Sequence, residues 1–596
     1  MSPRFSFLKT RFAALYAGTF LSLIYFCVDW SMQTTFRGMS FWELYPSNAL
    51  LALLLMLPYM LSRKVWVQGL AIGVADCVLI ANLMYRRTYF TPIPPESYLM
   101  AGNLGDFTAS VLDSLYWFDF GFFILLAATT LLAAKLPREA TRHLWRNYLI
   151  SLAALSILVA AALISYGGFE KRMRKLSSSC YYNTTPVQIY TPVGYLVYTA
   201  METEDELTPE VTARVNSWLE EKALLRPYVG LPDSVAPREN LVVILLESFE
   251  GWLPENEIDG KPITPYINSL LKDSSTFYAP RVLSQVSTGR SIDGQLLVFT
   301  GLLPRLHTIF STKHPDNFYP TLNKALREKY GTKSYIFTCD RPITWNQQAV
   351  SPAFGYDAMY SRDAWELDDM IGKPAKLSDQ SFFRQSVSLV KDTSLWPAGE
   401  PRLLTFVSYS GHNPFILPEE KRDPDFNLHA MGFNKRFADY TTMAHYTDAQ
   451  LHIIIDYLKS RPDYNRTLVV ITGDHEGLAY YRDEIVAADT LGLVPDKQFV
   501  PLIILNSPVP GRVDEVVGQY DIYPTLLGML GLDNYRWKGL GQTMLAPVAG
   551  FAVSSYTKEV VGDTIGVSPA LRDNIFNARR VSDDIIHFDM LRGRFE

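Results

Sequence analysis

Cysteine is scarce in this chain of 596 residues, which contains four in total. They are Cys27, Cys77, Cys180 and Cys339, and no two of them have the spacing of metal ligands. A metal site built from cysteines is therefore excluded. Cys180 and Cys339 could pair in an oxidising compartment, but neither their spacing nor their sequence context requires a disulfide.

The chain also lacks an excess of positive charge. It carries 55 Lys and Arg against 61 Asp and Glu, a formal net charge of −6, and no basic stripe is visible in its polar part. Nucleic acid is therefore not an expected partner. There are no internal repeats or low-complexity segments, and the length exceeds that of one ordinary domain. No oligomeric state is predicted.

What the sequence does contain is a series of long apolar runs within its first 170 residues. One such run also fits a buried core helix, but five in succession with short charged loops favour membrane spans. The first is not followed by a recognisable cleavage site, so we interpret it as a retained anchor. The five runs are approximately Phe12–Val28, Ser47–Leu61, Val65–Tyr85, Trp117–Lys135 and Asn147–Ser165.

Lys and Arg concentrate in the N-terminal leader and in the second and fourth loops between these runs, which predicts that these segments are cytoplasmic. Arg86 and Arg87 in the third loop are an exception. Five spans then place everything after about Ser165 outside the cytoplasm. We therefore predict a five-helix transmembrane domain at 1–166, an extracytoplasmic helical linker at 167–239 and a large extracytoplasmic domain at 240–596. The linker helix, near Pro209–Leu225, would lie on the membrane surface or pack on the large domain.

From Asn240 onward, short apolar runs alternate with helix-like segments. The strand-like runs are Leu241–Leu246, Lys333–Phe337, Leu403–Val407, Leu468–Ile471 and Leu502–Leu505. Helix-like segments occur at Thr264–Lys272, Pro320–Tyr330, Phe433–Ser460 and Asp521–Leu530. This alternation predicts an α/β fold with a mostly parallel sheet.

Polar residues follow two of the predicted strands. Glu247 comes directly after Leu241–Leu246, and the pair Asp474 and His475 follows the run that begins at Leu468. In open α/β sheets, ligands bind beyond the carboxyl ends of the strands. We therefore expect these residues to share one site.

Ser291 and His412 are the other candidates for this site. Alone, each fits a structural role, because serine in a polar turn and histidine in a loop are common. Their combination with Glu247, Asp474 and His475 indicates a hydroxyl nucleophile activated by a metal ion. Oxygen ligands with one imidazole suit Mn²⁺ or Zn²⁺, with Mg²⁺ as a further option.

We predict Glu247, Ser291, Asp474 and His475 as the ligands of this metal ion. If Ser291 opens a helix, the helix N-terminus would favour a phosphate group. Arg290 could clamp phosphate oxygens. His412 could bind phosphate or act as a general acid toward the leaving group.

Six segments, in this order, resemble the lipoteichoic acid synthase family of the alkaline phosphatase superfamily, which also includes periplasmic phosphoglycerol transferases. The resemblance covers nearly the whole chain: five spans, a linker and a sulfatase-like extracytoplasmic domain. The segments are Leu246–Phe249, Gly289–Asp293, Thr344–Asn346, Ser410–Phe415, Gly473–Gly477 and Tyr520–Thr525.

The resemblance implies a phosphotransferase in the bacterial cell (inner) membrane that moves a phospholipid headgroup, typically from phosphatidylglycerol, to an envelope glycan or polymer acceptor. The transfer would proceed through a covalent Ser291 intermediate and release diacylglycerol. By matching position, Glu247, Asp474 and His475 correspond to metal ligands. The substrate-binding candidates are Arg290, Asp340, Arg341, Trp345 and His412.

This chain departs from the family pattern at three positions. The nucleophile is Ser291 where the family usually has Thr, and both hydroxyls can be phosphorylated. Gln347 replaces an Arg, and Thr338 replaces a His, in the pocket that reads the transferred group; Arg341 could restore the lost charge. The chain also lacks the Cys/Ser-x-Pro-x-Arg motif of formylglycine sulfatases, so that class is not expected.

Two alternatives use the same residues. The chain could be a phosphoethanolamine transferase, or a hydrolase of the phosphodiesterase, phosphatase or sulfatase type in which water replaces the acceptor. A third alternative, a non-catalytic binding module, is disfavoured because the metal ligands and Ser291 are all intact.

Overall fold

The computed structural model describes residues 10–595, except 33–35, 90–91, 100–113, 140–142, 178–183, 202–205, 307, 343, 373–374, 393–394, 479–480 and 556. The chain divides into two compact units. The helical unit comprises Met1–Leu99 and Val111–Asp205, and the α/β unit comprises Met100–Ser110 and Glu206–Glu596. The division falls inside the segment predicted as a linker; the predicted domain limits themselves stay predictions. Cys180 lies outside the described residues, and Cys339 is a buried free thiol.

Within its described residues, the helical unit contains five helical stretches that are long and apolar enough to cross a membrane, as predicted from the sequence. The second stretch, predicted from Ser47, is two helices that meet at Met56, two residues before Pro58. The five stretches are α1 (Arg11–Met32), α2 with α3 (Leu44–Leu55 and Leu57–Ser62), α4 (Val65–Tyr89), η5 with α7 (Trp117–Asp119 and Phe120–Lys135) and α8 (Leu144–Ser165). Shorter elements are η3 (Phe36–Ser40), α5 (Pro95–Leu99), α9 (Phe169–Ser177) and α10 (Thr184–Met201).

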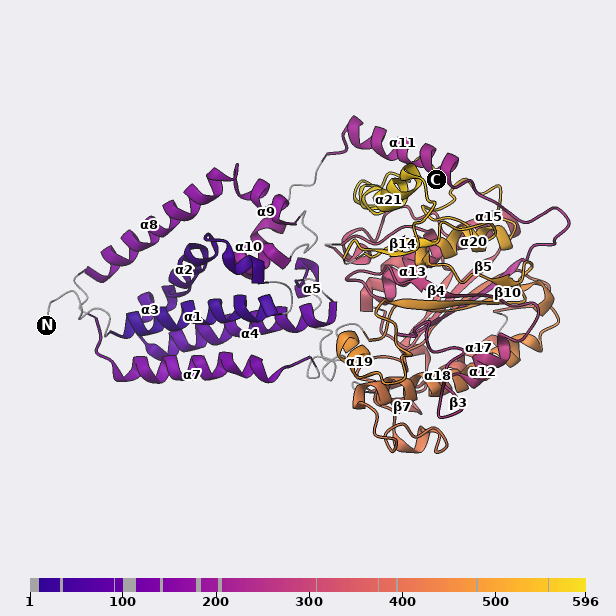
Figure 1. The fold of residues 1–596 in the computed structure, drawn as a ribbon, viewed down its shortest axis with the longest axis horizontal. Coiled ribbons are helices and arrows are strands. Elements are labelled where there is room, and N and C mark those ends of the chain that lie inside the picture. Colours follow the sequence, from indigo (N-terminus) through magenta and orange to yellow (C-terminus); the bar gives the residue numbers. More distant parts are fainter. Residues whose placement is uncertain are drawn as a thin grey trace. The chain divides into compact units, whose positions relative to one another are not determined.

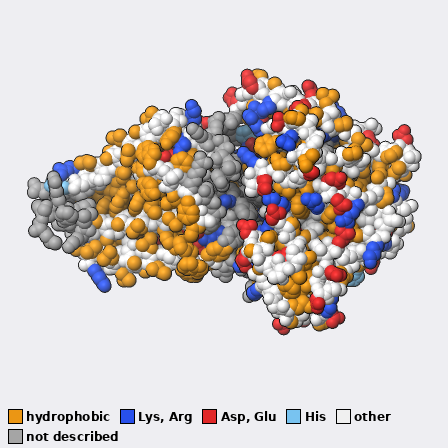
Figure 2. Space-filling view, in the orientation of Figure 1, with side chains coloured by type: hydrophobic (Ala, Val, Ile, Leu, Met, Phe, Trp, Pro, Cys, Tyr) orange, Lys and Arg blue, Asp and Glu red, His pale blue; other side chains and the backbone are white. Residues whose placement is uncertain are grey.

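Arg87, one of the two basic residues that depart from the loop-charge pattern, is buried inside the helical unit. Its guanidinium pairs with Asp29 of α1 at 3.0 Å and with Asp119 of η5 at 2.5 Å. The charge is therefore neutralised within the bundle and joins three of its helical segments. Hydrophobic side chains cover much of the described surface of this unit (Figure 2).

A mixed nine-stranded sheet forms the centre of the α/β unit, in the order β12-β4-β11-β10-β1-β9-β5-β6, with β13 also paired to β4. All pairings are parallel except the two made by β11. The strands are β1 (Asn240–Leu246), β4 (Phe277–Leu283), β5 (Lys333–Thr338), β6 (Ala358–Tyr360), β9 (Arg402–Val407), β10 (Thr467–Gly473), β11 (Phe499–Leu505), β12 (Gly511–Arg512) and β13 (Val517–Gly518). The predicted α/β fold with a mostly parallel sheet is thus confirmed.

Helices cover both faces of this sheet (Figure 1). One face carries α11 (Pro209–Leu225), α13 (Ser291–Thr300), α15 (Leu322–Tyr330), α16 (Gln347–Phe354), α20 (Ile522–Met529) and α21 (Pro569–His587). The other carries α12 (Pro265–Leu270), α17 (Asp379–Asp392), α18 (Lys435–Lys459) and α19 (Arg482–Ala488). Alternate side chains of β1 enter the two cores, as a strand with both faces buried requires.

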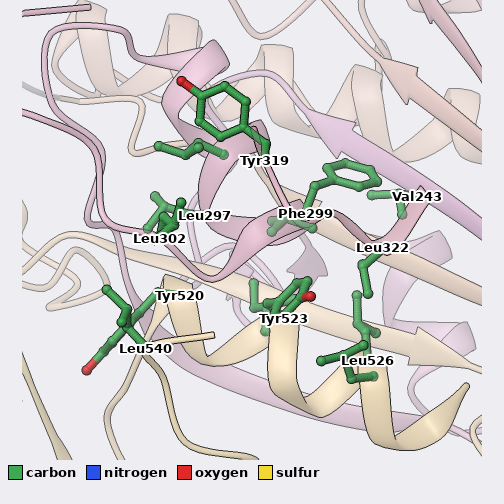
Figure 3. Close-up of a cluster of buried hydrophobic side chains, with 14 of the residues drawn as sticks. Val243, Leu297, Phe299, Leu302, Tyr319, Leu322, Tyr520, Tyr523, Leu526 and Leu540 are labelled. Carbon is green, nitrogen blue, oxygen red and sulfur yellow. The ribbon is translucent and has the colours of Figure 1, made fainter. Parts of the chain in front are cut away.

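The core beneath α13 fixes the helix that carries Ser291. Leu297 and Phe299 of α13 pack with Tyr523 and Leu526 of α20 and with Val243 of β1 (Figure 3). All five side chains are fully buried. Because interiors are close-packed, this cluster leaves α13 little freedom to shift relative to the sheet.

The linker helix α11 packs on the α/β unit rather than standing alone. Trp218 Nε1 donates a hydrogen bond to the Asn574 carbonyl at 2.9 Å, and Arg214 pairs with Asp584 at 2.8 Å; both partners lie on α21. Of the two placements predicted for this helix, the structure shows the one on the catalytic domain.

Candidate functional site

Four strand ends meet at one edge of the sheet. Leu246 of β1 is in register with Gly473 of β10, and Val407 of β9 is in register with Leu245 and with Thr338 of β5. Residues that directly follow these strands therefore emerge side by side. They are Glu247 after β1, Asp474 and His475 after β10, Ser408 to His412 after β9, and Asp340 after β5.

Ser291 is the first residue of α13. Arg290 precedes it in the N-cap position with φ 47° and ψ −113°, a conformation that is strained for a residue with a side chain. Asp293 stabilises the preceding loop because its carboxylate accepts hydrogen bonds from the backbone N–H groups of Ser287 and Gly289, at 2.8 and 3.0 Å. Asp293 was not predicted as a site residue, because its role depends on a loop that only the fold places beside it.

The hydroxyl of Ser291 points into the group of predicted ligands. Its Oγ lies 3.4 Å from Glu247 Oε2 and 3.3 Å from His475 Nε2. His475 Nε2 is in turn 3.5 Å from Glu247 Oε1 and 3.6 Å from Asp474 Oδ2. The four residues predicted as ligands are therefore brought together.

Three of these residues fit a metal ion. Glu247, Asp474 and His475 each offer one ligand atom, and these atoms all lie within 4.8 Å of one another. Asp474 Oδ1 accepts hydrogen bonds from the N–H groups of Ser248 and His475, whereas its Oδ2 is buried and has no hydrogen-bond partner within the described chain. A buried carboxylate oxygen without a partner is costly, and a cation would satisfy it.

Contacts behind His475 orient it for the same purpose. Its Nδ1 lies 2.8 Å from the Glu476 carbonyl, which can only accept, and 2.9 Å from Arg290 Nη2, which can only donate, so these contacts orient the ring with Nε2 toward the site without fixing its tautomer. Arg290 donates to the same carbonyl at 2.9 Å and forms a buried ion pair with the Glu476 carboxylate. The Arg290 guanidinium thus lies behind His475.

Burial shifts the pKa values of these groups toward their neutral forms. It raises the pKa of Glu247 to about 7 and that of Asp474 to about 6. It also lowers the pKa of His475, with the Arg290 charge acting in the same direction. Little positive charge therefore stabilises the Glu247 and Asp474 carboxylates. A bound cation would supply that charge.

His412 is held next to Glu247 by the loop after β9. The approach is so close that a Cβ on Gly411 would lie 2.0 Å from the Glu247 carbonyl oxygen. His412 Nδ1 donates to the Asn413 carbonyl at 2.6 Å, and the ring stacks on Tyr409 with centroids 5.1 Å apart. Burial, together with the charge of Lys376, lowers the pKa of His412 to about 4, so its imidazole is neutral near pH 7.

The remaining predicted residues have different surroundings. Trp345 has φ 54° and packs, half-buried, against the core that includes α13. Arg341 is exposed. Gln347, where the family has Arg, is buried and donates a hydrogen bond to Gln295 of α13 at 2.7 Å. Thr338 Oγ1 accepts a hydrogen bond from the Asp340 N–H at 3.2 Å.

A known family model matches the part of the chain that contains this site. The Sulfatase family model matches residues 239–532, the segment that supplies every residue of the site. This segment is therefore similar to the Sulfatase family, and Ser291, His412 and the three residues that could hold a metal ion all lie within it.

Curated relatives extend the similarity beyond the sulfatase domain. Lipoteichoic acid synthase 2 of Bacillus subtilis is 26% identical over 491 residues, covering 79% of this chain and 72% of the relative. Lipoteichoic acid synthase of Staphylococcus aureus (strain USA300) is 25% identical over the same length, with 79% and 73% covered. The resemblance to this family, and the predicted class of phosphotransferase of the lipoteichoic acid synthase type, are confirmed.

Among solved structures, the lipoteichoic acid synthase LtaP from Listeria monocytogenes superposes with a TM-score of 0.51. It is 21% identical, and the match covers 62% of this chain and 98% of that one. This likeness supports the fold of the sulfatase domain. With the five apolar stretches, the relatives support a membrane protein whose catalytic domain lies outside the cytoplasm.

Proposed function

We propose that this chain is a membrane-anchored, metal-dependent phosphoglycerol transferase. It takes the headgroup of phosphatidylglycerol and transfers it to a glycan or glycerophosphate acceptor of the cell envelope. The proposal places the chain in a bacterial cell membrane, with a transmembrane domain at 1–166, a linker at 167–239 and a catalytic domain at 240–596.

One observation carries the proposal. The Ser291 hydroxyl stands at the N-terminus of α13 and within 3.4 Å of two of the three groups that could hold a metal ion. The N–H groups at a helix N-terminus favour a phosphate, and the nearby ligand cluster favours a cation. A nucleophilic oxygen, a phosphate site and a metal site thus coincide.

Glu247, Asp474 and His475, with Ser291, would hold the metal ion, and Mn²⁺ or Zn²⁺ suits these oxygen and imidazole donors, with Mg²⁺ as a further option. When bound, the ion supplies Lewis acidity and lowers the pKa of a hydroxyl. Glu476 and Arg290 hold the His475 ring with Nε2 toward the site. The departure from Thr to Ser at position 291 leaves this chemistry unchanged.

The transfer has two steps at Ser291. In the first, Ser291 Oγ attacks the phosphorus, the bond between phosphorus and the diacylglycerol oxygen breaks, and diacylglycerol leaves with the proton. In the second, an acceptor hydroxyl attacks the same phosphorus, the bond to Ser291 Oγ breaks, and the acceptor's proton ends on Ser291 Oγ. Neutral His412, whose Nε2 holds no proton, suits the relay of that proton from the acceptor to Ser291.

The substrate pocket in this proposal contains Arg290, Asp340, Arg341, Trp345 and His412. Asp340 and His412 follow neighbouring strands at the edge where Glu247 also emerges, which supports their inclusion. Arg290 forms an ion pair with Glu476 and contacts His475 Nδ1. We therefore propose that its charge attracts the phosphate from behind the ligand cluster.

Release of diacylglycerol from phosphatidylglycerol tests the proposal. The purified full-length chain should release it with added Mn²⁺, Ser291→Ala should lose activity by at least ~10³-fold, and Ser291→Thr should retain it. Lipid turnover that continues without any acceptor, with free glycerol phosphate as product, would indicate the hydrolase instead. Unchanged activity in Ser291→Ala would refute the covalent mechanism.

A further inference from the structure

A short basic helix follows the fifth apolar stretch of the helical unit. The stretch α8 ends at Ser165, and the chain turns at Gly167 and Gly168, whose φ values of 86° and 104° favour glycine. The next helix, α9, lies beside the end of α8 (Figure 1). Since the catalytic domain, which follows α8 in the chain, lies outside the cytoplasm, α9 starts at the outer end of the helical unit.

Contacts within the helical unit hold α9 at this end. Arg172 of α9 forms a buried ion pair with Glu43, the residue directly before α2. Met173 is fully buried, and the Phe169 ring packs edge to face on Tyr190 of α10, with centroids 5.9 Å apart. One side of α9 is therefore fixed to the bundle, and the helix does not move away from the membrane level at which α8 ends.

The charge of α9 is opposite to the pattern of the loops. Its nine residues include one acidic residue and four basic ones, although Lys and Arg normally gather on the cytoplasmic side of a membrane protein. Lys171 is exposed and forms no ion pair with the described residues. A helix that combines such charges with a buried apolar side is typical of the headgroup region of a membrane. The basic residues are Lys171, Arg172, Arg174 and Lys175.

Lipid headgroups are the anions that this position offers. Hydrophobic side chains cover much of the described surface of the helical unit, so we expect its outer end to lie at the level of the headgroups (Figure 2). A helix of nine residues is ~13 Å long, and its charges act over a Debye length of ~8 Å at physiological ionic strength. The charges of α9 therefore reach the headgroups next to the bundle, and an anionic phospholipid is the ligand that fits them.

We propose that α9 binds the headgroups of anionic phospholipids in the outer leaflet and so enriches them around the enzyme. This inference builds on the proposed function, because phosphatidylglycerol is the donor of that reaction, and it adds a lipid-binding site outside the catalytic domain. The phosphate of phosphatidylglycerol carries a negative charge that no ammonium group balances, whereas phosphatidylcholine is neutral as a whole. Each basic side chain near an anionic membrane surface strengthens binding by ~5-fold.

Photo-crosslinking measures this binding directly. The full-length chain is reconstituted in phosphatidylcholine nanodiscs that contain a small fraction of photoreactive phosphatidylglycerol, and mass spectrometry identifies the labelled peptides. The α9 peptide should be labelled at least ~10-fold more strongly than by phosphatidylcholine that carries the same photoreactive group. This excess should largely disappear at ~1 M NaCl, where the Debye length falls to ~3 Å.

Neutralising the three basic residues other than Arg172 tests the role of charge. The triple variant Lys171→Gln, Arg174→Gln and Lys175→Gln should lower labelling of α9 by phosphatidylglycerol at least ~10-fold. It should also raise KM for phosphatidylglycerol at low salt and leave kcat unchanged, because the catalytic groups are intact. If the triple variant does not fold, the salt dependence of the wild type and a ~5-fold loss in Lys171→Gln alone decide.

A matched control removes the same charge from the loops predicted to be cytoplasmic. Lys64→Gln, Lys135→Gln and Arg146→Gln together should leave the labelling of α9 unchanged. Equal labelling of α9 by the two lipids would mean that the helix merely touches the membrane and would overturn the inference. Displacement of the label by a soluble glycerophosphate polymer would also overturn it, because the ligand would then be the polymer.

The labelling does not depend on turnover, so this inference and the proposed function can fail separately. Ser291→Ala should label α9 as strongly as the wild type does. If the wild type labels α9 but releases no diacylglycerol, the proposed function fails and the lipid site stands. If the wild type releases diacylglycerol but α9 shows no preference for phosphatidylglycerol, only the lipid site is overturned.

Discussion

Lys222 shows how a single buried charge affects the stability of the α/β unit. It lies in α11 and is 6% exposed. Burial, with a smaller effect from the neighbouring Arg226, lowers its pKa to about 7, well below the value near ~10.4 of an unfolded lysine. Because the pKa of Lys222 is lower in the folded chain than in the unfolded chain, its deprotonation favours folding. This contribution to the free energy of unfolding is complete above the unfolded pKa and is lost as the pH falls toward 7.

Replacing this lysine should therefore stabilise the protein in a pH-dependent way. Lys222→Met removes the cost of burying a charge, so the thermal midpoint of the full-length chain should rise by a few degrees at pH 7. For a domain of this size, ~1 kcal/mol shifts the midpoint by roughly 2–4 °C. The gain should shrink as the pH is raised toward 10. Scanning fluorimetry across this pH range measures it.

The control for this substitution is Lys435→Met. Lys435 is 82% exposed in its pair with Asp439, so its loss should change the midpoint little at any pH. A gain from Lys222→Met that does not depend on pH would mean that packing, rather than charge, limits stability at this position.

Individual site residues were predictable where strand ends or motifs mark them. Glu247, Asp474 and His475 follow apolar strands, and that rule alone places them at one edge. Glu476 and Lys376 were not predicted, because their significance lies in partners that only the fold brings near. Arg290 contacts Glu476, which lies 186 positions away in the sequence, and Asp340 contacts Lys376, which lies 36 positions away.

The position of Ser291 depends on how α13 packs against the core. Its Gly294 faces the end of β10 so closely that a Cβ would lie 2.5 Å from the Asp474 carbonyl oxygen. Only glycine permits this approach, which sets the distance between Ser291 and the candidate ligands.

Gly294→Ala should therefore displace α13 from the end of β10. Overpacking of this kind costs ~1–3 kcal/mol, and a shift of Ser291 should lower transfer activity by at least ~10-fold. Thermal unfolding and diacylglycerol release measure the two effects. Gly73→Ala in α4 is the control, since its Cβ would meet Leu126 at an ordinary 3.4 Å; equal effects of both substitutions would contradict the role of Gly294.

Elements with a continuous apolar run were predicted well, and interrupted ones were not. The strands β1, β9 and β10 match their predicted segments, but β4 was missed because Pro280 and Arg281 break its apolar pattern. The antiparallel direction of β11 could not be predicted from the sequence, because the topology of the whole sheet sets which strands pair. The five apolar stretches were recognised from length and composition, which is all that membrane spans require.

At the scale of the whole molecule, the chain combines an apolar helical unit with a polar sulfatase-type unit. Charged side chains of both signs are spread over the α/β unit, whereas the helical unit presents mainly hydrophobic ones (Figure 2). A membrane anchor on the same chain raises the effective concentration of lipid donors at a site outside the cytoplasm. The proposed function accounts for both units, since a soluble donor would need no anchor.

The central claim is that Ser291 carries the transferred group. The most direct test is mass spectrometry of the peptide containing Ser291, after the full-length chain has been incubated with Mn²⁺ and phosphatidylglycerol vesicles without acceptor. We predict an added glycerophosphoryl group on Ser291, which an acceptor then removes. An unmodified Ser291 peptide from protein that nevertheless releases diacylglycerol would contradict the account.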